Sequence, residues 1–142
     1  MASGYATTLQ QVKTILDGIS SSTLPVKFDY FETMPTSLPA GYVIINGGSE
    51  RAIDTANNDV GVSLLLMAIF APEESSGAAL KWAQCLDAIT AEFRKESNRS
   101  LAGNAYNLTI DEIPKPSFTT EFGMPAMVFS VRLTAKMLKS TQ

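Results

Sequence analysis

The C-terminal part of the chain alternates between apolar and polar residues. From Met127 to Met137 every second residue is apolar, and the residues between them are mostly polar, among them Arg132 and Lys136. Successive side chains of a strand point to opposite faces, so this pattern predicts a long strand with one buried face and one exposed face.

A second segment, Gly61–Phe70, has apolar residues at nearly every position. For a length of ten residues this composition is typical of a central strand covered on both faces, with a buried helix as the competing interpretation. Two helices can cover only one face of a small sheet. Another subunit is therefore a candidate for the cover of the second face of this strand.

Two segments show the spacing of three and four residues between apolar positions that is typical of amphipathic helices. The first is predicted over Ala6–Ile19, and the second begins near Ala71–Ser76 and runs to about Lys95. We interpret both apolar stripes as core packing rather than as the lining of a ligand pocket. Their members are Leu9, Val12, Leu16 and Ile19 in the first helix, and Trp82, Leu86, Ile89 and Phe93 in the second.

Three shorter segments are predicted as further strands: Val26–Phe31, Tyr42–Asn46 and Tyr106–Ile110. Gly47-Gly48 is expected to close the second of these strands. Pro114 is expected to end the third, because proline cannot donate a hydrogen bond within a sheet.

The polar segment Ser49–Asp59 and the segment Lys115–Pro125, which contains two prolines and a glycine, are predicted as exposed loops. Together the elements predict a single α+β domain over residues 1–142. Its sheet should be mainly antiparallel with four to five strands, and two helices should pack on one face.

The composition limits the classes of function. The chain has 142 residues, of which 45% are hydrophobic and 18% charged, which is typical of one folded domain. A net charge of −3 disfavours binding to nucleic acid through a broad basic surface. We find no secretion signal and no apolar run long enough for a membrane helix, so we expect a soluble protein made in a cytoplasm.

The sequence predicts no catalytic, cofactor-binding or metal-binding residue. It has no histidine, which excludes the commonest general base and nucleophile arrangements built on that residue, and no phosphate-binding glycine motif. The carboxylate pairs Glu73-Glu74 and Asp111-Glu112 are interpreted as solvated residues at the ends of elements. Cys85 is the only cysteine, and its position in the second helix predicts a buried small side chain in a reducing environment.

The charges are unevenly distributed along the chain. Residues 49–74 contain five carboxylates against one arginine, whereas residues 121–142 contain three basic residues against one carboxylate. Opposite patches on one chain suit head-to-tail contacts that close into a ring. Ordinary scatter of solvated surface charge is the alternative interpretation.

The order of these elements, ending in the strand MVFSVRLTAKM, resembles the tail terminator proteins of long-tailed bacteriophages. The resemblance extends from Leu9 to Met137 and concerns length, element order and the lack of enzymatic residues. It implies a small α+β protein that forms a ring, usually a hexamer, on the last ring of the tail tube. The implied partners are other copies of the chain, the tail tube protein and the head-side connector, in the neck region of a virion assembled in the host cytoplasm.

Two other functions remain open. The first is a phage neck or head-completion protein, and the second, from a different class, is a small ligand-binding α+β domain with a pocket between sheet and helices. On the tail terminator resemblance, the loops Asn46–Val60 and Pro114–Pro125 are candidates for contacts along the tail axis. The candidate interface residues are Glu50, Arg51, Asp54, Asp59, Lys115, Phe118, Phe122, Arg132 and Lys136.

Overall fold

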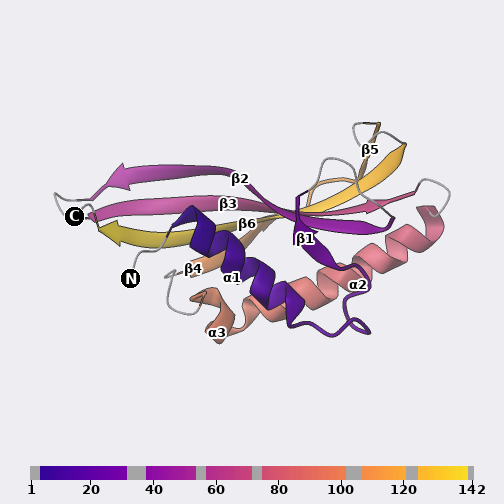
Figure 1. Ribbon diagram of the computed structural model, residues 1–142, viewed down its shortest axis with the longest axis horizontal. Coiled ribbons are helices and arrows are strands. Elements are labelled where there is room, and N and C mark those ends of the chain that lie inside the picture. The colour runs from indigo at the N-terminus through magenta and orange to yellow at the C-terminus, as the bar shows by residue number, and fades with distance from the viewer. Residues whose placement is uncertain are drawn as a thin grey trace.

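The computed structural model describes residues 4–31, 38–53, 57–71, 75–101, 107–120 and 125–140. The fold is α+β, with one twisted sheet and helices packed against it (Figure 1). None of the described helices has both the length and the apolar content that a membrane span requires. The elements in chain order are α1 (Tyr5–Asp17), β1 (Phe28–Tyr30), β2 (Ala40–Ala52), β3 (Asn57–Phe70), α2 (Ser75–Arg94), α3 (Glu96–Arg99), β4 (Asn107–Glu112), β5 (Ser117–Thr119) and β6 (Ala126–Ser140).

The sheet has six strands in the order β1-β2-β3-β6-β4, and β5 also pairs with β6. The β1–β2 pair is parallel and the other pairs are antiparallel. The mainly antiparallel sheet is therefore confirmed, but the expected four to five strands were too few. The additional strand, β5, lies inside the segment Lys115–Pro125, which was wrongly predicted to be a loop throughout. Three residues with Phe118 as the single large apolar side chain are too short to show an alternating pattern.

Strands β2 and β3 form a long hairpin that pairs from Ala40 opposite Ile69 to Ala52 opposite Asn58. The predicted loop Ser49–Asp59 is wrong, because both strands continue through most of this segment. Gly47-Gly48 lies inside β2 and does not close it. Gly47 has a φ of 133° at a shift in register between Ile45 and Gly47, so the glycine marks an irregularity within the strand rather than its end.

Strand β3 lies at the centre of the sheet, and it pairs with β6 from Asn57 opposite Ser140 to Phe70 opposite Met127. One face of both strands forms the main core. The alternation predicted for β6 is confirmed, since Val131 and Leu133 are fully buried whereas Arg132 is exposed.

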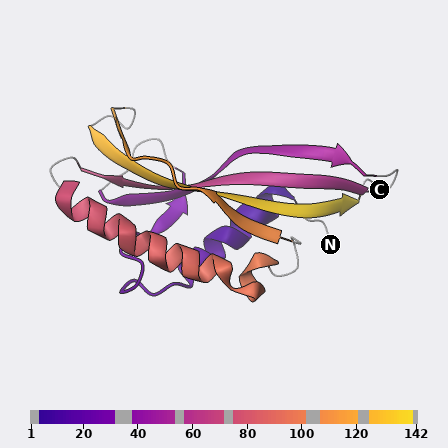
Figure 2. The same cartoon turned by 180° about the vertical axis from the view of Figure 1, so that it is seen from behind.

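Both long helices pack on this same face of the sheet (Figure 2). The predicted apolar stripes are confirmed as core: Val12 and Leu16 of α1 are buried, as are Trp82 and Phe93 of α2. The Trp82 ring contacts the ring of Phe129 in β6, with centroids 5.7 Å apart. The two helices therefore pack against the sheet from one side and do not cover its other face.

The second face of β3 is covered in part by the chain itself. Met67 and Ile69 are buried in a small separate cluster with Tyr42, and Leu38 packs against it. The expectation that another subunit covers this part of the face was therefore wrong. Tyr42 is the neighbour of Met67 in β2 and Leu38 lies just before that strand, so Gly61–Phe70 by itself does not indicate either residue.

Candidate functional site

The face of the sheet opposite the helices is polar in the half nearer the β2–β3 hairpin tip. We call this half the polar face. The strand register places Ser49, Gly61 and Lys136 in one row across it, and Ser63 and Thr134 in the next. All five residues are exposed or partly exposed, and within the described chain no helix covers them. The polar face also contains a cavity of about 410 Å³, which is lined by Asn46, Ser63, Leu64, Asp111, Glu112, Arg132 and Leu133.

Arg132 and Lys136, two of the predicted interface residues, are exposed on this polar face. Arg132 forms an ion pair with Glu112 of β4, with an N–O distance of 3.1 Å. Both side chains are more than half exposed, so the pair contributes little to stability. The neighbouring Asp111 accepts hydrogen bonds from the hydroxyls of Thr109 and Thr134. The carboxylate pair thus connects β4 to β6 across the surface.

Glu50 and Arg51 lie near the end of β2 and point to opposite faces of the sheet. Glu50 lies on the helix side and accepts a hydrogen bond from the Tyr5 hydroxyl at 3.1 Å. Desolvation, together with the hydrogen bond to Glu50 and its charge, raises the pKa of the Tyr5 phenol. Arg51 lies opposite Asp59 of β3 on the other face. The predicted Asp54 lies outside the described residues.

Parts of the acidic and basic segments of the sequence lie side by side in the described structure. Residues 57–60 of β3 pair with residues 137–140 of β6, so segments of opposite charge lie on adjacent strands of the same sheet. Asp54, Glu73 and Glu74, three of the five carboxylates in the acidic segment, lie outside the described residues, so the separation of charge into complementary ends stays a prediction. Pairing far apart in the sequence brings these charges together, and a count along the chain does not reveal it.

Lys115 and Phe118 lie at the other end of the molecule, near and in β5. Both are exposed, and Phe118 is 72% exposed, the largest value among the exposed large hydrophobic residues. The predicted Phe122 lies outside the described residues. Figure 1 shows β5 and the tip of the β2–β3 hairpin at opposite ends of the longest axis. The two segments predicted as contact loops are thus far apart, and the sheet connects them.

Both sides of the sheet end in a strand with an open edge, which the sequence did not predict. Strand β1 pairs with β2 only from Gly41 to Val43, so Ile44–Ala52 has a strand neighbour on its β3 side alone. On the other side, β4 pairs with β6 and is the last strand in the order of the described sheet. Open edges present backbone donors and acceptors that can pair with another chain. The sequence did not predict the open edge of β2, because this strand was expected to end at Asn46.

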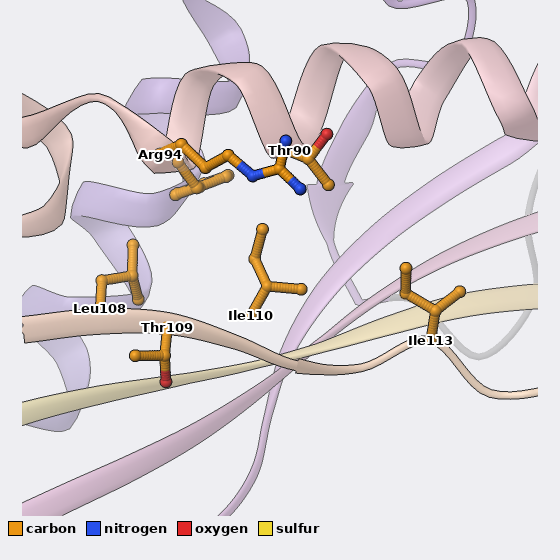
Figure 3. A pocket seen from close by; sticks show the side chains of 7 residues that line it. Thr90, Arg94, Leu108, Thr109, Ile110 and Ile113 are labelled. Atoms are coloured by element: carbon orange, nitrogen blue, oxygen red, sulfur yellow. The ribbon is translucent and has the colours of Figure 1, made fainter.

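A cavity of about 370 Å³ lies beside the β4 edge, between that strand and α2 (Figure 3). Its lining is mostly apolar, and Arg94 of α2 is the charged residue among the lining side chains. Figure 3 shows the Arg94 guanidinium extending over Ile110. Arg94 is exposed and makes no ion pair with any other described residue. The seven residues that line the cavity are Thr90, Phe93, Arg94, Leu108, Thr109, Ile110 and Ile113.

Cys85 is buried in the core, as predicted. Burial raises the pKa of its thiol to about 11, against a weaker lowering by a hydrogen bond with the Val26 backbone. The thiolate is the nucleophilic form, so this thiol is unreactive near neutral pH. Among the described residues, no group of three or more cysteine and carboxylate side chains is arranged to hold a metal ion.

Comparison with known proteins adds no family to these observations. No protein-family model matches the sequence, and no curated protein matches it significantly. The functional interpretation therefore depends on the surfaces described above.

Proposed function

We propose that this chain is a structural protein of bacteriophage particles, a tail terminator that forms a hexameric ring on the last ring of the tail tube. In this role it stops polymerisation of the tube and joins the tube to the head-side connector. The mechanism is geometric, because a ring that binds tube subunits on one side and has no tube-like edge on the other ends growth without a reaction.

The observation that carries this proposal is the presence of two exposed segments at opposite ends of the long axis. The hairpin tip ends in Ile53, which is 54% exposed, and β5 at the other end contains Phe118. Connecting segments that a rigid sheet holds in place are typical sites of recognition. One subunit can therefore bind the tube at one end and the connector at the other.

The cavities support a ligand-binding domain less well. The cavity beside β4 and a second one of about 290 Å³ beside α1 and β1 lie at margins of the fold. In a third, of about 410 Å³ on the polar face, the charged groups Arg132 and Glu112 already pair with each other and are more than half exposed. A small-molecule site needs several polar groups that converge on a mostly enclosed ligand. Arg94 and Thr90 are the main polar groups on the α2 side of the first cavity, which also opens at the strand edge.

Polymerisation of tail tube protein in the presence of this chain tests the proposal. Electron microscopy of the tubes should show that the protein, at about one ring per tube end, limits tube length. Ile53→Ser and Phe118→Ser serve as matched variants at the two ends of the subunit. The variant at the end that binds the tube should abolish the limit on tube length, while the ring still forms. An unchanged distribution of tube lengths would contradict the proposal. Binding to a connector without any effect on tubes would favour the neck protein instead.

A further inference from the structure

We propose that copies of this chain join edge to edge, with β2 of one copy paired to β4 of the next. The inference deepens the proposed function and depends on its self-assembly. It concerns the open edge Ile44–Ala52 on one side of the sheet and Asn107–Glu112 on the other. Strands added at an exposed edge gain backbone hydrogen bonds, and the alternating side chains decide which partner fits.

The strand directions suit this junction. Strand β2 runs antiparallel to β3, β3 to β6, and β6 to β4, so β2 and β4 point in opposite directions. Rotation about a ring axis that runs roughly along the strands keeps these directions unchanged in every copy. The β2 strand of one copy therefore meets β4 of the next in antiparallel orientation. The joined sheet alternates in direction throughout, without a new parallel pair.

The charges at the two edges are complementary on the helix side of the sheet. Glu50 points to that side from β2, and Arg94 overhangs the cavity beside β4. In the antiparallel register that sets Glu50 of one copy opposite Ile110 of the next, the carboxylate enters this cavity below the guanidinium. Arg94, which has no ion pair within the described chain, then forms one with Glu50 of the neighbouring copy. The cavity partly shields this ion pair from water.

The same register also matches charges on the polar face. It sets Arg51 opposite Thr109, whose hydroxyl donates a hydrogen bond to Asp111 at 2.9 Å. Arg51 therefore comes next to a carboxylate of the neighbouring copy. The added strand would also cover Ile113, which is 50% exposed beside the cavity. Each face of the junction thus has one pair of opposite charges, with apolar cover on the helix side.

A charge exchange tests the helix-side pair. Glu50→Lys and Arg94→Glu should each raise the dissociation constant of the assembly by at least about tenfold, because each places like charges together. The double variant should recover most of this loss. Glu50→Gln retains an acceptor for Tyr5 without the charge, and Lys81→Glu changes an exposed charge elsewhere on α2. Analytical sedimentation of all five variants and the wild type measures the dissociation constants. If Glu50→Lys and Arg94→Glu associate as tightly as the wild type, the proposed junction is overturned.

Cross-linking distinguishes this junction from a symmetric pairing of two β2 edges. Ser49→Cys and Thr109→Cys lie on the polar face at opposite edges, and the native Cys85 is buried and does not compete. With a short bismaleimide, the double-cysteine chain should give a ladder of covalent species beyond the dimer, and each single variant should give none.

Products that stop at the dimer, and that also form with Ser49→Cys alone, would show β2 paired with β2 and overturn the inference. Rings in native mass measurements without any cross-linked ladder would overturn the junction and leave the proposed function intact. A chain that stays monomeric both alone and with tube protein would overturn both.

Discussion

Leu133→Asp is expected to abolish the native fold. Leu133 is fully buried in the centre of β6, between Leu64 of β3 and Ile110 of β4 in the strand register. A carboxylate at this position has no partner in the apolar core, and burying it costs several kcal/mol. The total stability of a domain of this size is about 5–15 kcal/mol, so most of it would be lost. Thermal and urea unfolding followed by circular dichroism measures the effect, and Val131→Asp should behave in the same way.

The matched control for this prediction is the double variant Arg132→Glu/Lys136→Glu on the opposite face of the same strand. Both side chains are exposed, and the ion pair of Arg132 with Glu112 is worth less than about 1 kcal/mol. The double variant should therefore unfold within a few degrees of the wild type. If it unfolds as readily as Leu133→Asp, the assignment of the two faces of β6 is wrong.

Gly41→Ala is expected to destabilise the start of β2 by about 1–3 kcal/mol, which is typical of overpacking. An added Cβ would lie 2.6 Å from the carbonyl oxygen of Lys27 and 2.9 Å from Cδ2 of Phe28. Gly41 pairs directly with Phe28, whose ring is buried, so relief of the clash must separate β1 from β2. Urea unfolding with a two-state fit gives the change in the free energy of unfolding.

Gly77→Ala provides the control for Gly41→Ala. A Cβ at Gly77 would meet nothing within 4 Å, and the residue lies in α2, where alanine is favoured over glycine. This variant should be neutral or more stable by up to about 1 kcal/mol. A Gly41→Ala protein as stable as the wild type would show that β1 does not pack against Gly41 as described.

The elements that bury one face could be predicted from the sequence. In β6 the alternation that ends with Leu133 and Met137 reports directly which side chains enter the core. The same holds for the apolar stripes of α1 and α2, because a repeated contact with one surface imposes a period on the sequence. The α+β class followed from these periods.

The elements that bury neither face, or that depend on distant residues, could not be predicted. The end of β2 is exposed on both faces, so Glu50 and Arg51 resemble a loop although they are paired with β3. The packing of Tyr42 and Leu38 with the cluster that contains Met67 depends on the folded path of the chain. The open edges of β2 and β4 depend on strand order, which no local pattern specifies.

Native mass measurement of the purified protein, alone and with tail tube protein, tests most directly whether this chain is a ring-forming structural protein. We expect a closed oligomer of six copies at high protein concentration or in the presence of tube protein. Added salt should weaken this oligomer, because Glu50, Arg51 and Arg94 are exposed charges in the free subunit. A mass that remains that of one chain under every condition would contradict the proposed function.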